Sequence, residues 1–150
     1  LGEEWTRLLG GKIARFWNVY GWEVPNERSH VIPDLVVKAL ETGKIDLMTE
    51  GTERRQFVHI DDCAKNLVRI KNAGELDADL TTGEWISILG LANMIADNTG
   101  AVVQPGTKKG FENILEPSKI IGSINFDISL EQGIDELIVK GKQYLSAKSL

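Results

Sequence analysis

Arg55 is the residue whose type and position most clearly suggest binding chemistry in this 150-residue sequence. The guanidinium of arginine is a planar fork that donates paired hydrogen bonds to phosphate or carboxylate oxygens. Arg55 begins an apolar segment that ends at Ile60, where an unpaired charge is costly. We therefore expect it to bind an anionic group of a ligand. The alternative is a partly buried ion pair with Asp61 or Asp62.

Asn18 and the residues around position 30 offer further polar groups. Asn18 lies where a buried strand opens into a turn, and its amide has both a donor and an acceptor for a phosphate oxygen or a hydroxyl. The alternative is a turn-forming Asn that satisfies its own backbone. Ser29, His30 and Val31 stand at the start of a predicted helix, whose free N–H groups attract phosphate. Alternatively, Ser29 caps that helix.

The composition narrows the classes of function. The sequence carries 17 Lys and Arg against 22 Asp and Glu, which gives a formal net charge of −5. An acidic chain without a basic tract is a poor candidate for binding nucleic acid or an anionic membrane. No apolar run of the sequence reaches the length needed to span a bilayer. We expect no metal site, because His30 and His59 lack a cluster of further ligands.

Cys63 is the only cysteine, so no internal disulfide can form, and we expect a reducing, cytoplasmic location. We expect Cys63 to be an inert packed thiol and not a nucleophile. The first residue is Leu1 and not Met, and the sequence opens in the middle of a helical pattern. We therefore expect a piece of a longer protein, with a processed terminus as the alternative.

The elements that position these residues follow from the apolar pattern. Helical spacing with glycine stops and capping residues predicts helices over residues 1–9, 31–42, 61–70, 85–98 and 129–147, and a short one from Glu116. Runs of strand length predict strands over residues 12–18, 45–48, 55–60, 78–82 and 102–105. The helix over 61–70 carries the apolar residues Leu67 and Val68, and Ile13–Phe16 is expected in a strand covered on both faces. The order indicates an α/β fold, a mixed α+β lobe with short strands and about five helices.

Five segments, in fixed order, resemble motifs of the NAD-dependent epimerase/dehydratase family, the extended short-chain dehydrogenases/reductases. Arg15–Gly21 is similar to the family's R-x-x-N-x-Y-G strand and turn, and Gly51–Ala64 to G-x-x-x-R-D-F-V-x-V-x-D-x-A. The other three segments are Ser29–Pro33, Thr82–Ile88 and Ile128–Ile134. Together they span nearly the whole chain and are most similar to UDP-glucose 4-epimerase-like members.

The resemblance implies that residues 1–150 are the C-terminal, nucleotide-sugar-binding portion of an extended Rossmann-type enzyme. The N-terminal Rossmann half, which holds most of the NAD site, would then be missing from this chain. The implied substrate is a nucleoside-diphosphate sugar and the implied cofactor is NAD. The implied substrate contacts are Asn18, Ser29, His30, Val31, Asp46, Met48, Arg55 and Lys109, and Phe16 would lie near the nicotinamide. Core packing is the alternative for Phe16 and Met48, and solvent exposure for Asp46 and Lys109.

The sequence also departs from the family. Gln56 replaces the usual Asp of R-D-F, Trp22 replaces a Pro, and Glu116 stands where an Asp is common. The Gly-rich dinucleotide fingerprint does not occur. Tyr20 does not belong to a catalytic Tyr-x-x-x-Lys pair, because Val24 stands four residues later. We therefore assign no catalytic residue and expect the chain to be inactive alone.

The resemblance implies an epimerase that works by transient oxidation at sugar C4. The alternatives are a 4,6-dehydratase or reductase fragment, and a free-standing binding or assembly module without catalysis. An apolar surface around Ile13–Phe16 further predicts self-association, so we expect a homo-oligomer.

Overall fold

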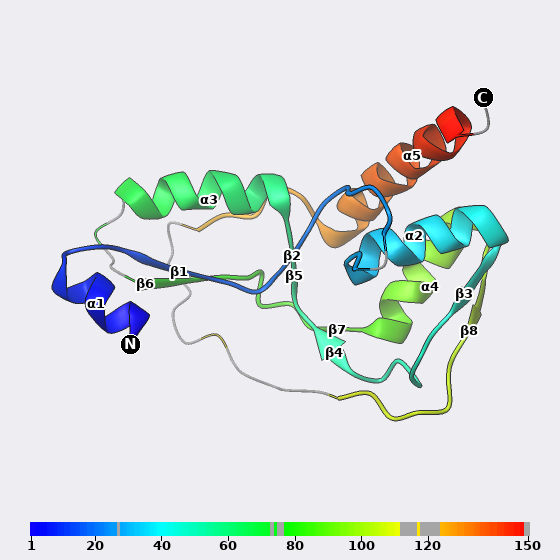
Figure 1. The fold of residues 1–150 in the computed structure, drawn as a ribbon, viewed down its shortest axis with the longest axis horizontal. Coiled ribbons are helices and arrows are strands. Elements are labelled where there is room, and N and C mark those ends of the chain that lie inside the picture. The colour runs from blue at the N-terminus through cyan, green and yellow to red at the C-terminus, as the bar shows by residue number, and fades with distance from the viewer. Residues whose placement is uncertain (27, 73, 75–76, 112–116, 118–123, 149–150) are drawn as a thin grey trace.

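The computed structural model describes residues 1–26, 28–72, 74, 77–111, 117 and 124–148, which form a mixed α/β fold (Figure 1). The helices of this part of the chain are α1 (Gly2–Leu8), α2 (Val31–Thr42), α3 (Ile60–Asn72), α4 (Ile88–Thr99) and α5 (Leu130–Lys148). Its strands are β1 (Ile13–Phe16), β2 (Asn18–Tyr20), β3 (Lys44–Asp46), β4 (Arg54–Arg55), β5 (Phe57–His59), β6 (Asp77–Leu80), β7 (Ile86–Ser87) and β8 (Val102–Gln104). The short helix expected from Glu116 lies outside the described residues.

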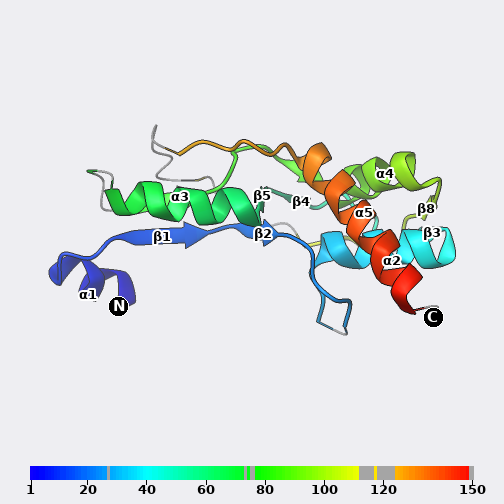
Figure 2. The same cartoon turned by 90° about the horizontal axis from the view of Figure 1, so that it is seen from above.

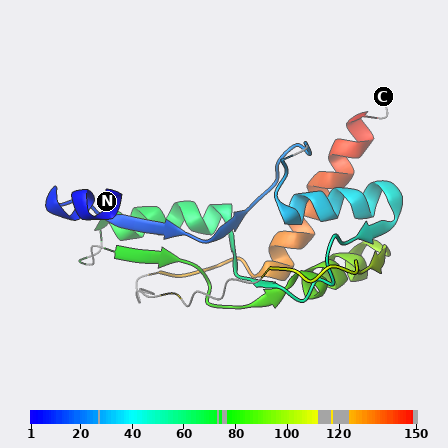
Figure 3. The same cartoon turned by 60° about the horizontal axis from the view of Figure 1, so that its bottom comes forward.

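The elements gather at two ends of an elongated molecule (Figure 1). At one end β1 and β6 pair in parallel, with Ile13 beside Asp77 and Phe16 beside Leu80. At the other end α2, α4 and α5 pack together next to the parallel pair β3–β8. Between the ends β2 pairs in parallel with β5. The N-terminal and C-terminal helices therefore lie far apart (Figure 3).

The larger hydrophobic core belongs to the end built from α2, α4 and α5. Its fully buried side chains include Ile32, Val36, Leu91, Ile95, Ile134 and Leu137. Burying a side chain of this size stabilises a fold by roughly 1.5–3 kcal/mol. A smaller core lies under α3 and consists of Val58, Cys63, Ile70, Ala78 and Leu80. Each end of the molecule thus has a core of its own.

Local sequence signals fix the ends of the helices. α2 and α4 stop at Gly43 and Gly100, whose φ angles of 66° and 75° lie in the left-handed region that glycine adopts without strain. The expected capping box at the start of α5 is confirmed. The backbone N–H of Ser129 donates to Gln132 Oε1 (3.0 Å), and that of Gln132 donates to Ser129 Oγ (3.2 Å).

One expected helix starts in the wrong place. The helix predicted from Trp85 begins at Ile88, because Ile86–Ser87 forms β7 and pairs antiparallel with β4. The Ser87 hydroxyl then accepts the N–H of Gly90 and caps α4. The pairing with β4 is a contact between distant segments, which helical periodicity does not report.

Several apolar side chains near α3 and β1 are exposed, which overturns one expectation about burial. Leu67 and Val68 are 40% and 61% exposed on α3. β1 was expected to be covered on both faces, but Phe16 is 55% exposed. Figure 2 shows α3 lying on one side of β1. Apolar side chains at this end of the molecule therefore remain on the surface of the described chain.

None of the described helices combines the length and the apolar character that crossing a membrane requires. The described residues also contain no group of three or more His, Cys, Asp or Glu side chains placed to hold a metal ion.

Candidate functional site

A cavity of about 580 Å³ lies where β1 ends and α2 begins. Its wall contains four of the expected site residues, namely Phe16, Asn18, His30 and Val31. The remaining lining residues are Trp17, Val19, Tyr20, Ile32, Phe57, Ile60 and Cys63. Open α/β sheets bind ligands outside the carboxyl ends of their parallel strands, and this cavity lies at such an end of β1.

Asn18 begins β2 and lies opposite Phe57 of β5. Its Nδ2 donates a hydrogen bond to the backbone carbonyl of Gln56 (2.9 Å), so the bond crosses to another strand and does not close its own turn. In the described part of the chain the Oδ1 atom has no hydrogen-bond partner. Phe16, two residues earlier, has an exposed ring that a ligand can reach.

The start of α2 is not capped by Ser29. His30, and not Ser29, is the N-terminal cap residue, and Ser29 Oγ instead accepts the N–H of Asn26 (2.7 Å). The backbone N–H of His30 donates to Glu23 Oε1 (2.5 Å). The His30 imidazole lies 3.2 Å from the same carboxylate. A carboxylate of the chain thus already lies at this helix terminus, as the helix dipole favours.

Arg55 is half-buried in β4 and donates to two backbone carbonyls, those of Arg54 (2.8 Å) and Phe111 (2.9 Å). The alternative of an ion pair with Asp61 or Asp62 is not formed. Arg55 does not line the cavity at the end of β1, although it immediately precedes Gln56, whose carbonyl holds Asn18.

Asp46, Met48 and Lys109 do not line the cavity at the end of β1. Asp46 ends β3, and Met48 is 87% exposed just beyond it. The loop with Lys109 runs beside this segment, because the N–H of Glu50 donates to the carbonyl of Lys108 (2.8 Å). All three side chains are exposed, so the core alternative for Met48 is not formed. The expected residues thus fall into two groups: one at the cavity, and one along the segment from β3 to β4.

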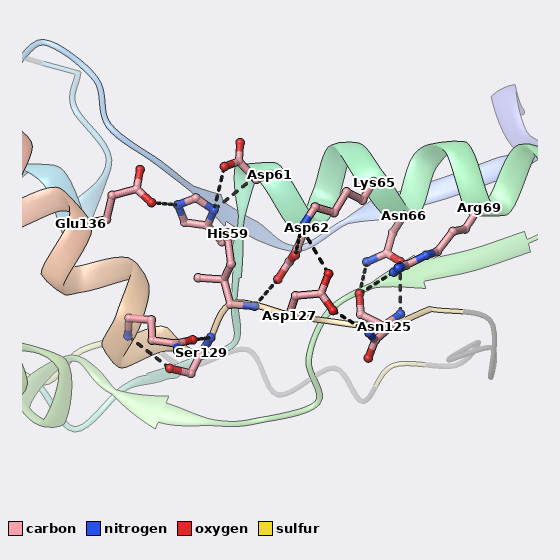
Figure 4. A network of polar contacts seen from close by, with 12 residues as sticks. His59, Asp61, Asp62, Lys65, Asn66, Arg69, Asn125, Asp127, Ser129 and Glu136 are labelled. Atoms are coloured by element: carbon pink, nitrogen blue, oxygen red, sulfur yellow. Dashed lines mark hydrogen bonds and ion pairs between the residues drawn. The ribbon is translucent and has the colours of Figure 1, made fainter.

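A buried polar network holds the returning chain against α3 (Figure 4). Asp62 Oδ2 accepts the N–H of Ile128 (2.8 Å). Asn66 both donates to the carbonyl of Asn125 (2.8 Å) and accepts its N–H (3.2 Å). Asp62 and Asn66 are fully buried. The segment they hold lines a second cavity, of about 690 Å³, which Tyr20 also lines.

Sequence reasoning missed the role of Gln56. Its side chain is fully buried, and the Thr81 hydroxyl donates to its Oε1. The only sequence signal for this role was that Gln56 replaces the family's usual Asp. The sequence could not indicate Thr81 as its partner, because Thr81 lies 25 residues away.

Sequence reasoning also missed a Tyr-x-x-x-Lys spacing, formed by Tyr144 and Lys148. Both residues lie near the end of α5. The Tyr144 ring packs on Trp22, with 5.9 Å between the ring centroids, and Lys148 Nζ is 3.7 Å from Glu41 Oε1. Neither lines the cavity at the end of β1, so their geometry is that of surface packing.

Cys63 is buried in the wall of the cavity. Burial raises the pKa of its thiol, which keeps it protonated and weakly nucleophilic. This environment agrees with the expected inert thiol.

A profile of the NAD-dependent epimerase/dehydratase family matches residues 7–79, which include β1, β2, α2, β5 and all of α3. Just under half of the chain thus resembles this family. The matched segment carries three of the five motifs on which the resemblance was based, and it supplies every residue that lines the cavity at the end of β1.

Solved structures of family members share the fold. The UDP-glucose 4-epimerase of Thermotoga maritima, solved with UDP-glucose, matches with a TM-score of 0.78 at 22% identity and covers 95% of this chain and 50% of that one. The UDP-glucose 4-epimerase of Thermus thermophilus in complex with NAD matches with a TM-score of 0.73 at 19% identity, over 93% of this chain and 49% of that one.

Among curated proteins, a dTDP-4-dehydro-6-deoxy-D-allose reductase of a Streptomyces species is 29% identical over 136 residues, 83% of this chain and 41% of that protein. The chain thus spans about two fifths of the length of the curated relative it matches. The proteins similar to this chain thus include both epimerases and a reductase.

The residues at the end of β1 fit one end of an NAD molecule. Phe16 offers a flat, exposed ring against which a nicotinamide can pack. The sequence holds no Gly-rich fingerprint for the cofactor's diphosphate. The fit is therefore limited to the nicotinamide end.

Proposed function

We propose that this chain is the nucleotide-sugar-binding portion of an NAD-dependent sugar-nucleotide epimerase. The cavity at the end of β1 is the observation that carries the proposal, because it gathers Phe16, Asn18, His30 and Val31 from separate segments. It combines an apolar floor with a few polar groups, as small-ligand sites do. Residues 1–150 would act as one binding unit.

In this proposal the sugar nucleotide extends from the cavity toward the second group of residues. Arg55 and Lys109 supply positive charge for the diphosphate. Ser29, His30 and Val31 remain proposed contacts at the start of α2, where the Glu23 carboxylate already accepts the His30 N–H. Asp46 and Met48 lie where the base would rest. The guanidinium of Arg55 now serves two carbonyls, so it has N–H groups left for an anion.

The parent reaction would be a transient oxidation at sugar C4. Bound NAD would supply the hydride acceptor for this step. The residues of this chain would hold the sugar in place beneath the nicotinamide, with Asn18 and Phe16 nearest to the reacting ring. We assign no proton-transfer group to the chain and expect no turnover from these 150 residues alone. A rate of UDP-glucose epimerisation above the buffer background would contradict this expectation.

Calorimetric titration of the 150-residue chain with UDP-glucose tests the binding proposal. We expect Arg55→Ala to weaken binding by about tenfold or more, because a charge-assisted hydrogen bond contributes about 1.5–3 kcal/mol. Arg55→Lys keeps the charge but loses the planar fork, and should fall in between. Lys142→Ala, on the exposed face of α5, is the charge control. Equal affinities for all four chains would rule out a diphosphate role for Arg55.

The likeness to a dTDP-sugar reductase favours a second candidate, the binding portion of a dTDP-sugar reductase or 4,6-dehydratase. A titration series with UDP-, GDP- and dTDP-sugars separates the candidates by their preferred base. A preference for dTDP would favour the reductase. A free-standing binding module would bind the same ligands, and its function would not require an N-terminal Rossmann half.

A further inference from the structure

Gln56 connects three strands at the cavity. It lies between β4 and β5 and is fully buried. Its side-chain Oε1 accepts a hydrogen bond from the hydroxyl of Thr81, which immediately follows β6. Its backbone carbonyl accepts the Nδ2 of Asn18, the first residue of β2. One residue thus joins the end of β6 to the polar side chain in the cavity wall.

This arrangement fixes which end of the Asn18 amide faces a ligand. A backbone carbonyl only accepts hydrogen bonds, so the atom that meets it at 2.9 Å must be the nitrogen. The oxygen then points away and lacks a partner in the described part of the chain. Asn18, which lines the cavity, therefore keeps a free acceptor.

Gln56 itself is poorly satisfied for a buried side chain. Within the described residues its Nε2 has no hydrogen-bond partner. A buried donor without a partner is destabilising, so an apolar side chain of similar length would suit the core at least as well. Packing alone therefore does not explain a glutamine at position 56. The hydrogen bond to Thr81 does explain it, because this bond fixes Gln56 in place and the Gln56 carbonyl in turn holds Asn18.

We propose that Gln56, held by Thr81, is a positioning residue that turns the Asn18 oxygen toward the cavity, where it selects a hydroxyl of the bound sugar over a phosphate oxygen. An acceptor attracts a hydroxyl, which can donate, and repels a phosphate oxygen, which cannot. The selection of a sugar hydroxyl rests on the proposed function, whereas the positioning of Asn18 does not.

Side-chain amide NMR of the ¹⁵N-labelled chain tests the positioning without ligand. The Asn18 pair of N–H signals is identified by its loss in Asn18→Asp. We expect these signals to move toward those of a solvent-exposed amide in both Gln56→Met and Thr81→Val. The controls Gln143→Met and Thr107→Val, at exposed positions, should leave them in place. Unchanged Asn18 signals in folded Gln56→Met or Thr81→Val would overturn the inference.

A double-mutant cycle tests the consequence for binding. Gln56→Met should weaken UDP-glucose binding about fivefold in the wild-type background and leave it unchanged in an Asn18→Ala background, because Gln56 acts through Asn18. An equal loss in both backgrounds means that Gln56 is only structural. Asn18→Ala should weaken UDP-glucose but not UDP, whereas an equal loss for both would place Asn18 at the diphosphate. A wild-type chain that binds no nucleotide sugar refutes the proposed function, and the NMR result still decides the positioning.

Discussion

A single acidic side chain, Asp77, ties the first elements of the chain to β6. Its Oδ2 accepts from Arg7 Nη2 of α1 (2.5 Å) and from Arg15 Nη2 of β1 (3.3 Å). The hydrogen bond from Arg7 is the main cause that holds the pKa of the Asp77 carboxyl below its ordinary value of 3.8. Ionised Asp77 therefore stabilises the folded chain.

Asp77→Asn should lower the free energy of unfolding at pH 7. It should also make that free energy fall less between pH 7 and pH 3. A carboxyl with a lowered folded pKa contributes stability above its unfolded pKa and loses it as the pH falls through the folded value. The contribution is therefore full at pH 7, declines once the pH falls below the ordinary value of 3.8, and is gone only below the lowered folded value. Urea unfolding at pH 7 and pH 3 measures both effects. Asp135→Asn, on the exposed face of α5, is the control, and a similar loss there would count against the prediction.

Residue identities predicted some positions of the site and not others. Asn18 and His30 could be placed from sequence because a strand end and a helix start are local signals. The Glu23 carboxylate at the His30 N–H and the Thr81 partner of Gln56 depend on contacts across the fold. Whether the predicted residues contact a substrate stays a prediction, which the titrations address.

Among the elements, α5 depends on a close approach to β2. A Cβ atom at Gly133 would collide with the hydroxyl of Tyr20. Tyr20 is buried, and its hydroxyl has no hydrogen-bond partner within the described residues. Burial, together with the carboxylates of Asp62 and Glu136, raises the pKa of Tyr20, so the hydroxyl stays protonated. A glycine is therefore required for the helix to pack at this distance.

Gly133→Ala should lower the free energy of unfolding by about 1–3 kcal/mol, the usual cost of overpacking a core. Combining it with Tyr20→Phe should recover part of the loss, because the atom that the new methyl meets is removed. Tyr20→Phe alone should not destabilise the chain, since it removes a buried hydroxyl without a partner. Chemical denaturation measures all three variants. Gly2→Ala, where nothing lies within 4 Å of the added atom, is the control.

Elements with local boundary signals were predicted well. α2 runs from Val31 to Thr42 as expected, because its apolar spacing and its Gly43 stop are adjacent in sequence. α4 was misplaced at its start because Ile86–Ser87 pairs with β4, more than 30 residues earlier. Two-residue strands such as β4 and β7 have too little sequence for a pattern.

On the scale of the whole molecule, the end formed by β1, β6 and α3 exposes apolar side chains. Phe16 and Val68 are 55% and 61% exposed, and Ile60 is 49% exposed. Parallel strand pairs normally have both faces covered. We expect this surface to be covered by another protein surface, and in the isolated chain by a second copy.

Val68→Lys should shift the isolated 150-residue chain toward the monomer. A charge placed in an apolar contact is costly to bury, whereas it is harmless on a free surface. Light scattering over a range of concentrations measures the average mass. Val139→Lys, at a valine that is 54% exposed on α5, is the matched control. A wild-type chain that is monomeric at all concentrations would contradict the expected self-association.

The α/β class and the family could be predicted from the sequence because they rest on motifs in order along the chain. The separation into two ends with two cores could not, since it depends on which strands pair. Arg55 shows the difference: its place in the motif was clear, but its position outside the cavity follows from the three-dimensional path of β4 and β5.

The grip of α3 on the returning chain also limits how the sequence can vary in length. Asp62 and Asn66 lie one helical turn apart and hold the backbone at Ile128 and Asn125. An inserted or deleted residue between those two points would pull one buried polar side chain off its partner, at a cost that local rearrangement cannot offset. The number of residues between Asn125 and Ile128 is therefore fixed by the spacing of Asp62 and Asn66 on α3. The same two anchor points fix where the chain enters α5.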